Sequence, residues 1–337
     1  MIECIFTIDY EIYGDGKGSL KVLVFDPAEK LRNIFKKADC RFVAFIETAE
    51  LELIEAKETD TAIDDVKNQI QMFYAEGFEI GLHLHPQWYK ALHQDGQWLL
   101  DDSEYNLCSL PRERIVEIVD RSIGYLRKVL RQPDFTPLSF RAGNWLMQPT
   151  ALAAKVLAEK GIKLDSSVFK GGLQRRHGLD YRNAISNDYY WTFSEHVDIP
   201  DANGILLEIP TYTKMVPFWK MLTIKRVGLK GKEGSSNRKS SPWLKRIERL
   251  IDFLRFRYPL KLDFCRMTLD ELTGMIDTII LEDQKDPNRY RPIVAIGHTK
   301  DLLDYETVES FLVYLKKMTS GFQLSITCIT NVRSEMK

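Results

Sequence analysis

Short runs rich in β-branched and aromatic residues alternate with segments of helical periodicity over the first half of this 337-residue chain. The expected strands are Glu3–Asp9, Arg41–Thr48, Phe78–His85, Leu138–Arg141 and Ile162–Val168, and the expected helices are Pro27–Ala38, Asp64–Glu76, Ser109–Leu130 and Pro149–Lys160. Parallel strands are joined by crossovers of a dozen or more residues, usually a helix. The alternation therefore predicts an α/β fold of βαβ units around a parallel sheet.

The pattern loosens after the fifth strand and then returns. Residues 169–201 are rich in glycine, asparagine and aromatic side chains, and we expect a long loop region there. The later expected elements are strands at Gly204–Tyr212, Pro292–His298 and Gln323–Thr330 and helices at Thr268–Leu281 and Glu306–Lys317. Seven to eight strands without an internal repeat fit one barrel-like domain over residues 1–337 better than two domains.

A basic segment interrupts this domain at residues 217–262, where thirteen Lys and Arg residues face three acids and leave a net charge of +10. Its Gly/Ser/Lys-rich part at Lys230–Ser241 is expected to be mobile. Residues Ser241–Lys261 place apolar side chains on one helical stripe, a pattern that can lie on an anionic membrane surface. A solvated insertion, or a helix packed on the barrel, explains the same pattern. No nucleic-acid partner is expected, because the chain has a net charge of −1 and no recognised binding motif.

Composition and cysteine spacing indicate in which cellular compartment the protein is expected. No run of 18 apolar residues occurs, so no membrane-spanning helix is expected. The first apolar run follows Glu3 and ends at Asp9, which is typical of a folded strand rather than a signal peptide. The five cysteines are scattered and form no CxxC motif, which favours reduced thiols over disulfides or a thiolate zinc site. These features predict a cytoplasmic protein.

Acidic, basic and imidazole side chains recur where the expected strands end. They are Asp9, Glu11, Glu47, His83, His85, Arg141, Asp165 and His298. In (β/α) barrels the carboxyl ends of the strands meet at one rim, where the loops build the active site. The distribution therefore predicts that these side chains gather around one mouth.

Asp9 and Glu11 lie two residues apart, and side chains at this spacing on a strand point to the same face. Two neighbouring acids can divide the work of binding a metal ion and of accepting a proton. A polar turn led by Gly14, Asp15 and Gly16 explains the same residues equally well.

The sequence His83-Leu84-His85 presents two imidazoles on one face of a strand, a spacing that suits two ligands of one divalent metal ion. Two imidazoles and a carboxylate leave an open coordination position for water, as in catalytic zinc sites. A pair of hydrogen-bonded surface histidines is the alternative.

Other strand ends supply candidates for catalysis and substrate binding. Arg141 can hold a carboxylate through two hydrogen bonds and keep it ionised, or it can neutralise a buried acid for stability alone. Trp88 and Trp145 offer flat apolar faces for a sugar ring. Asp165 can bind a sugar hydroxyl or a histidine, or act in a turn, and His298 is a candidate general acid.

Taken in order, five segments resemble the sequential motifs of the polysaccharide deacetylases of the NodB-homology group. They are TIDYE (7–11), EIGLHLHP (79–86), SFRAGNW (139–145), LDSSV (164–168) and IGH (296–298). The resemblance implies a distorted (β/α)7 barrel that binds Zn²⁺ or a related metal and hydrolyses N- or O-acetyl groups on sugars. By position, Asp9 would be the catalytic base, Arg141 would orient it, and His298 would be the general acid.

For the metal, the resemblance implies Glu11 and His83 as ligands. The family's second metal histidine lies four residues after the first, where this chain has Gln87, so His85 is offset by two. Gly143 stands where the family has a proline in the arginine motif. Asp9 and Glu11 can also exchange the roles of base and ligand.

The function expected from these residues and from the resemblance is a metal-dependent hydrolase that removes an acetyl group from a sugar, with a lipid- or nucleotide-linked precursor of cell-surface polysaccharide as substrate. Two other functions stay open. One is a metal-free barrel that only binds carbohydrate, with Trp88, Trp145 and Trp191 as stacking platforms. The other is a glycoside hydrolase that pairs Asp9 or Glu11 with a further acid.

Overall fold

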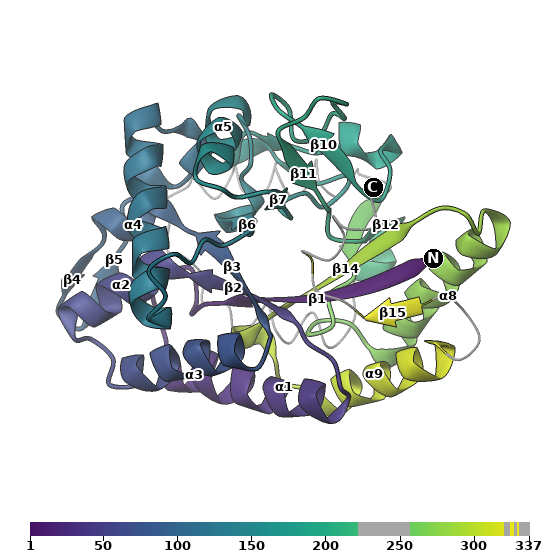
Figure 1. The fold of residues 1–337 in the computed structure, drawn as a ribbon, viewed down its shortest axis with the longest axis horizontal. Coiled ribbons are helices and arrows are strands. Elements are labelled where there is room, and N and C mark those ends of the chain that lie inside the picture. The colour runs from purple at the N-terminus through teal and green to yellow at the C-terminus, as the bar shows by residue number, and fades with distance from the viewer. Residues whose placement is uncertain (222–256, 320–323, 327–328, 330–337) are drawn as a thin grey trace.

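A curled, mostly parallel sheet forms the centre of the molecule, and the helices lie around its outer face (Figure 1). The computed structural model describes residues 1–221, 257–319, 324–326 and 329. The sheet runs in the order β10-β11-β7-β6-β3-β2-β1-β14, with β15 also paired to β1. Its strands are β1 (Ile2–Tyr10), β2 (Val43–Glu47), β3 (Glu79–Leu84), β6 (Ser139–Ala142), β7 (Leu164–Asp165), β10 (Trp191–Phe193), β11 (Leu206–Glu208), β14 (Arg291–His298) and β15 (Leu324–Ile326). The predicted α/β barrel-like fold is confirmed.

Seven helices of the described residues cover this sheet. They are α1 (Asp26–Lys37), α2 (Thr48–Lys57), α3 (Ile63–Ala75), α4 (Arg112–Leu130), α5 (Ala151–Glu159), α8 (Leu269–Lys285) and α9 (Tyr305–Thr319). Helix α2 was not predicted from the sequence. It begins directly after β2 because the Glu47 side chain accepts hydrogen bonds from the backbone N–H groups of Ala49 and Glu50.

Three small antiparallel pairs lie outside the main sheet. They are β4 (Leu92–Gln94) with β5 (Gln97–Leu99), β8 (Leu173–Gln174) with β9 (Leu179–Asp180), and β12 (Thr213–Val216) with β13 (Tyr258–Lys261). The expected loop region at 169–201 therefore holds short strands. The reason for the β8–β9 hairpin is local: Gly178 adopts a positive φ angle in the turn that joins the two strands.

The barrel closes through a seam of single bridges. The parallel strands β11 and β14, on the two sides of the opening, share no regular ladder, and Thr211 forms isolated bridges to Phe169 and to Val294 between them. Asp263 forms another bridge, to Ile296 of β14. This irregular closure is what makes the barrel distorted.

Alternation along β1 divides the apolar residues into two layers. Even-numbered side chains, such as Phe6 and Tyr10, pack outward against the helices, and Phe6 contacts the ring of Phe35 in α1. Odd-numbered side chains point into the barrel, where Ile5 belongs to a small interior cluster. That cluster contains Ile5, Val43, Phe45, Leu164, Leu207, Ile209, Val294 and Ile329. Because the side-chain period of a strand is two, Asp9 and Glu11 continue the inward series.

Most of the basic segment predicted at residues 217–262 lies outside the described residues, which omit 222–256. Its mobile part and its amphipathic stretch therefore stay predictions, and so does its docking to an anionic membrane. The flanks of the segment are described and meet in space, because Val216 of β12 pairs with Tyr258 of β13. Within the described part of the chain, no helix has the length and apolarity needed to cross a membrane.

Candidate metal and catalytic site

Strand register brings the predicted polar residues to one end of the barrel. Asp9 of β1 pairs in register with His298 of β14, and Glu47 of β2 lies level with His83 of β3. His83 in turn lies level with Arg141 of β6. Neighbours in register on parallel strands point to the same face, so these side chains share the mouth that the sequence predicted.

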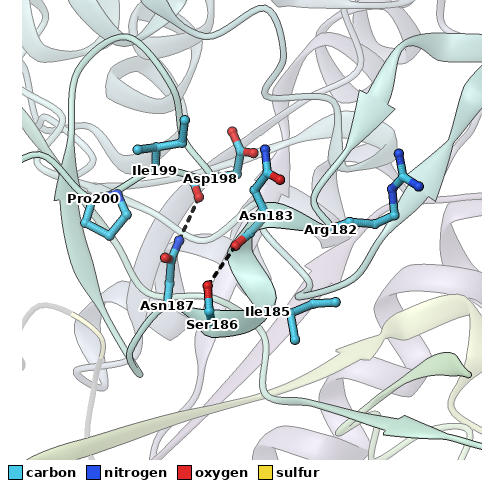
Figure 2. A pocket seen from close by; sticks show the side chains of 8 residues that line it. All are labelled: Arg182, Asn183, Ile185, Ser186, Asn187, Asp198, Ile199 and Pro200. Atoms are coloured by element: carbon cyan, nitrogen blue, oxygen red, sulfur yellow. Dashed lines mark hydrogen bonds between the residues drawn. The ribbon is translucent and has the colours of Figure 1, made fainter.

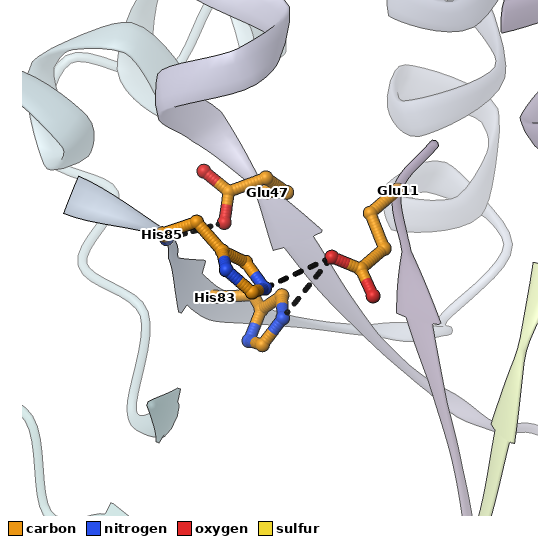
Figure 3. Close-up of side chains that lie close together, drawn as sticks. All are labelled: Glu11, Glu47, His83 and His85. Carbon is orange, nitrogen blue, oxygen red and sulfur yellow. Dashed lines mark hydrogen bonds and ion pairs between the residues drawn. The ribbon is translucent and has the colours of Figure 1, made fainter. Parts of the chain in front are cut away.

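Glu11 and the two histidines form the centre of this cluster (Figure 3). Oε2 of Glu11 lies 3.5 Å from Nε2 of His83 and 3.1 Å from Nε2 of His85. The two imidazoles meet edge to face, with ring centroids 4.9 Å apart. All three side chains are buried, which rules out the alternative of a surface histidine pair.

The donor set fits a divalent metal ion. Ligand atoms about 2.0–2.1 Å from a tetrahedral zinc ion lie about 3.3 Å from one another, and the Glu11 contacts bracket that value. Nδ1 of His83 lies 2.8 Å from the carbonyl oxygen of Arg141. When Nδ1 donates its proton to this carbonyl, Nε2 keeps its lone pair for a metal, as ligating histidines usually do.

His85 is oriented by two amide side chains. Its Nδ1 lies 3.2 Å from Nδ2 of Asn144 and 3.4 Å from Nε2 of Gln87. Amide nitrogen and oxygen positions are interchangeable by rotation, and Oε1 of Gln87 has no partner among the described residues. With that oxygen turned toward Nδ1, Gln87 accepts the Nδ1 proton and leaves Nε2 free to bind a metal. Gln87 is thus placed to orient the imidazole of His85.

Glu47 is the fourth member of the cluster (Figure 3). Its Oε2 accepts a hydrogen bond of 2.6 Å from the backbone N–H of His85, while its Oε1 holds the start of α2. Burial raises the pKa of Glu47, although the two imidazoles act in the opposite direction. Glu47 positions the chain at His85, and it offers a carboxylate oxygen within 4.8 Å of the ligand atoms of Glu11, His83 and His85.

Lys300 is a site residue that the sequence analysis missed. Its Nζ lies 2.7 Å from Oε1 of Glu11 and 3.1 Å from the carbonyl oxygen of Ile12. Burial alone would raise the pKa of Glu11, but Lys300 and His85 hold it well below its ordinary value. Glu11 is therefore an ionised carboxylate with one oxygen held by Lys300 and the other turned to the imidazoles. The signal in the sequence was the position of Lys300, two residues after His298 at the same strand end.

Asp9 is held by a buried arginine. Nη1 of Arg141 lies 2.6 Å from Oδ1 of Asp9, and Arg141 has no exposed surface. The remaining donors of the guanidinium go to Thr7 and Ser166, so every side of the group is satisfied. Burial alone would raise the pKa of Asp9, but Arg141, His83 and His298 lower it below its ordinary value. Asp9 is thus an ionised proton acceptor.

The guanidinium of Arg141 also lies against the face of an aromatic ring. The Cζ of Arg141 lies 4.2 Å from the ring centroid of Phe45. The ring has room because residue 81 is glycine: a Cβ at Gly81 would lie 2.7 Å from the Phe45 ring and 2.8 Å from the hydroxyl of Ser139. A cation over an aromatic face is attracted by the ring quadrupole, and the attraction grows when water is excluded.

His298 faces the other oxygen of Asp9, with Nε2 3.3 Å from Oδ2. Its Nδ1 lies 3.8 Å from Asp301, too far for a hydrogen bond, and has no partner among the described residues. Burial lowers the pKa of His298, so the imidazole is neutral at rest. Asp9, Glu11 and His298 also have ligand atoms within 4.8 Å of one another, so the exchange of roles between Asp9 and Glu11 remains open.

The predicted substrate-binding residues need correction. Trp88 is 1% exposed and packs against Trp98, so its ring offers no free face to a sugar. Asp165 is fully buried and accepts a hydrogen bond from Ser167 rather than from a histidine. Trp145 is half-buried near the mouth, and its role stays a prediction. The sequence predicted Trp88 and Asp165 as site residues because both follow or end a strand. The position of a residue at a strand end does not show which loops will cover its side chain.

Asp165 forms a buried carboxyl pair with Glu208. The two residues are in register on β7 and β11, and each keeps one oxygen without another partner among the described residues. Burial raises both pKa values, and for Glu208 the Asp165 charge raises the pKa further, well above the ordinary value. Two buried carboxyl groups with raised pKa values are expected to share one proton near neutral pH.

A surface hollow of about 540 Å³ lies apart from this cluster, between the turn at Asn183–Ser186 and residues 198–200 (Figure 2). Asn187 bridges its walls, because its Nδ2 donates to the carbonyl oxygen of Asp198. None of the predicted site residues lines this hollow.

No family model matches the chain, and no curated protein matches it. Solved structures do match over nearly its whole length. The structure from Mycobacterium smegmatis described as a polysaccharide deacetylase has a TM-score of 0.52 at 13% identity, covering 99% of this chain and 89% of that chain. PuuE allantoinase has a TM-score of 0.50 at 13% identity, covering 98% of this chain and 88% of that chain.

The same fold is found in enzymes of other names. The GH57-type branching enzyme from Pyrococcus horikoshii has a TM-score of 0.54 at 12% identity, covering 99% of this chain and 70% of that chain. Identities this low show the fold alone. The chain therefore shares the distorted barrel of the polysaccharide deacetylases, and its chemistry has to be argued from its own residues.

If the cluster binds zinc, we expect His83→Ala and His85→Ala each to weaken that binding by at least about a hundredfold, because each would remove one of the predicted ligands. Calorimetric titration of the metal-free protein with Zn²⁺ measures this directly. The matched control is His93→Ala, since His93 is exposed and lies outside the cluster. Undiminished zinc affinity in both cluster variants would rule out this site.

We expect Glu208→Gln to raise the melting temperature more at pH 8 than at pH 5. A carboxyl whose folded-state pKa is raised stabilises the fold at low pH, and that stability is lost as the pH rises through the folded value. Glutamine mimics the protonated form at every pH and so avoids this loss. Thermal unfolding of both proteins at both pH values is the measurement, with the exposed Glu113→Gln as control. An equal effect at the two pH values would contradict the shared proton.

Proposed function

We propose that this protein is a metal-dependent hydrolase that removes an acyl group, most simply acetyl, from a sugar. The observation that carries the proposal is the close approach of two constellations at one barrel mouth. Glu11, His83 and His85 form a donor set that fits a divalent ion. Asp9, ionised and held by Arg141, lies beside this set as a proton acceptor. Zinc suits these ligands best, because imidazole and carboxylate in a three-ligand set are typical of its catalytic sites.

A divalent ion bound there would lower the pKa of a coordinated water and polarise the acyl carbonyl. The chain's own groups would do the rest. Asp9 accepts the proton of the attacking water, since Arg141 keeps its carboxylate ionised and fixes its direction. His298 lies 3.3 Å from the same carboxylate, so a proton taken by Asp9 has a short path to the leaving nitrogen or oxygen.

The substrate proposed is a sugar linked to a lipid or a nucleotide, as a precursor of cell-surface polysaccharide. We also propose that the protein is cytoplasmic. Cys4, Cys40 and Cys108 are buried free thiols, which supports a reducing compartment.

A glycoside hydrolase is the second candidate, because the GH57-type branching enzyme has the same fold. Such an enzyme needs two carboxyl groups about 5–9.5 Å apart across the scissile bond. In this chain two of the acids at the mouth are engaged by cations: Glu11 by Lys300 and Asp9 by Arg141. That engagement favours the metal-dependent hydrolase.

We expect Asp9→Asn to reduce acetate release from N-acetylglucosamine 1-phosphate by about 10²- to 10⁴-fold, the usual contribution of a general base. Zinc content should stay unchanged, since Glu11 and the histidines remain. Enzymatic assay of acetate and elemental analysis provide the two readouts, with the exposed Asp134→Asn as control. Wild-type turnover in a metal-loaded Asp9→Asn protein would refute Asp9 as the base.

Removal of the metal separates the two candidate functions. We expect a chelator to abolish acetate release and added Zn²⁺ to restore it, because a bound ion would lower the pKa of the attacking water. A carboxylate-based glycosidase would cleave glycosidic bonds equally well with and without the chelator. Chelator-resistant release of sugar, without acetate, would decide for that second candidate.

A further inference from the structure

Lys261 carries an ammonium group at the mouth that forms no ion pair with a carboxylate of the described residues. It is the last residue of β13 and is half-buried. None of the ion pairs within 4.0 Å in residues 1–221 and 257–319 includes it. Instead its Nζ lies 4.1 Å from the ring centroid of Trp145 and 5.0 Å from that of Phe169. Aromatic faces attract such a charge, but they replace only part of what a counter-ion would give.

The aromatic platform under Lys261 is held in a strained backbone. Asn144 and Trp145 have φ angles of 55° and 67°, a region that bulky residues rarely adopt. The Tyr181 hydroxyl donates to the carbonyl oxygen of Trp145 and helps to fix this conformation. Strain of this kind persists only where the surroundings impose it, and it clusters at functional sites. Here it places the Asn144 amide against His85 and the Trp145 ring under Lys261.

Lys261 also lies close enough to the Asp9–Arg141 ion pair to interact with it electrostatically. The charged groups that act on it are Asp263, Arg266, Asp9 and Arg141. Burial lowers its pKa to about 8, so the ammonium form still predominates near neutral pH. The two acids that act on Lys261 are engaged elsewhere: Asp9 is paired with Arg141, and Oδ1 of Asp263 accepts hydrogen bonds from the backbone N–H groups of Cys265 and Arg266. Lys261 is thus a surplus cation beside the base.

We propose that Lys261 recognises a phosphate group carried by the acylated sugar, so that the substrate is a sugar phosphate ester rather than a neutral polysaccharide. This inference rests on the proposed function and names its substrate class. A lysine ammonium is a point charge that suits phosphate, whereas planar carboxylates favour the fork of an arginine. A neutral sugar would leave the charge unpaired and desolvated beneath it, at a cost in affinity. Nucleotide-linked and lipid-linked sugars share this phosphate chemistry.

Three probes and three variants test the proposal. The probes are N-acetylglucosamine, N-acetylglucosamine 1-phosphate and UDP-N-acetylglucosamine, and the variants are Lys261→Met, Lys261→Arg and Lys214→Met. Lys261→Met keeps the aliphatic contact with Trp145 and removes the charge. Lys214 is the matched control, because it is an exposed lysine on the adjacent strand β12.

For the wild-type protein we expect both phosphorylated probes to bind more tightly than N-acetylglucosamine. In Lys261→Met the KM for N-acetylglucosamine 1-phosphate should rise about ten- to a hundredfold, the usual effect of losing a hydrogen bond to a charged group, while kcat changes little. Lys261→Arg should retain most of the preference, and Lys214→Met should match the wild type. Equal affinity for UDP-N-acetylglucosamine and the 1-phosphate supports recognition of phosphate alone, and tighter binding of the former supports recognition of a nucleotide-linked sugar.

Calorimetric binding of the same probes separates this inference from the proposed function. If no acetate is released but phosphorylated probes bind in a Lys261-dependent manner, the hydrolase is wrong and phosphate recognition stands. If acetate is released from all probes with the same KM, or if Lys261→Met keeps the wild-type preference, Lys261 does not read phosphate and the inference is overturned.

Discussion

The buried ion pair between Arg141 and Asp9 is the interaction on which the rest of the site depends. Two charges taken out of water are tolerated only when their geometry is good and every remaining donor is satisfied. Arg141 meets this condition by contacting β1 through Thr7 and Asp9 and the end of β7 through Ser166. The pair therefore joins three strands at the level of the mouth and fixes the direction in which the Asp9 carboxylate faces. Removal of either partner would leave an uncompensated charge in the interior.

Much of this arrangement could be predicted from the sequence because it follows from the period of a strand. Two-residue alternation placed Asp9 and Glu11 on one face, and the structure confirms that both point into the barrel. The offset histidine pair was also predicted, and His83 and His85 do turn their Nε2 atoms to a common point. Local pattern and parallel topology together were enough for these residues, since neither depends on the details of a loop.

The rest depended on contacts that no local pattern contains. Trp88 was expected to face a sugar, yet the β4–β5 hairpin brings Trp98 against it and buries it. Glu208 was not recognised as the partner of Asp165, because the two residues lie 43 positions apart and meet only through register. Lys261 was counted with a basic segment, and only the tertiary structure places its ammonium over the ring of Trp145. In each case a loop or a distant strand decides the environment of the side chain.

The Glu47 carboxylate lies beside the candidate metal ligands and also caps the start of helix α2. One oxygen of its carboxylate holds the first N–H groups of α2, and the other holds the N–H of His85. If an ion took this carboxylate as a fourth protein ligand, both sets of hydrogen bonds would weaken and the first turn of α2 would fray. An ion coordinated by two imidazoles, one carboxylate and water would leave the start of α2 unchanged. The coordination number of an ion bound here would thus decide whether the first turn of α2 keeps its Glu47 cap.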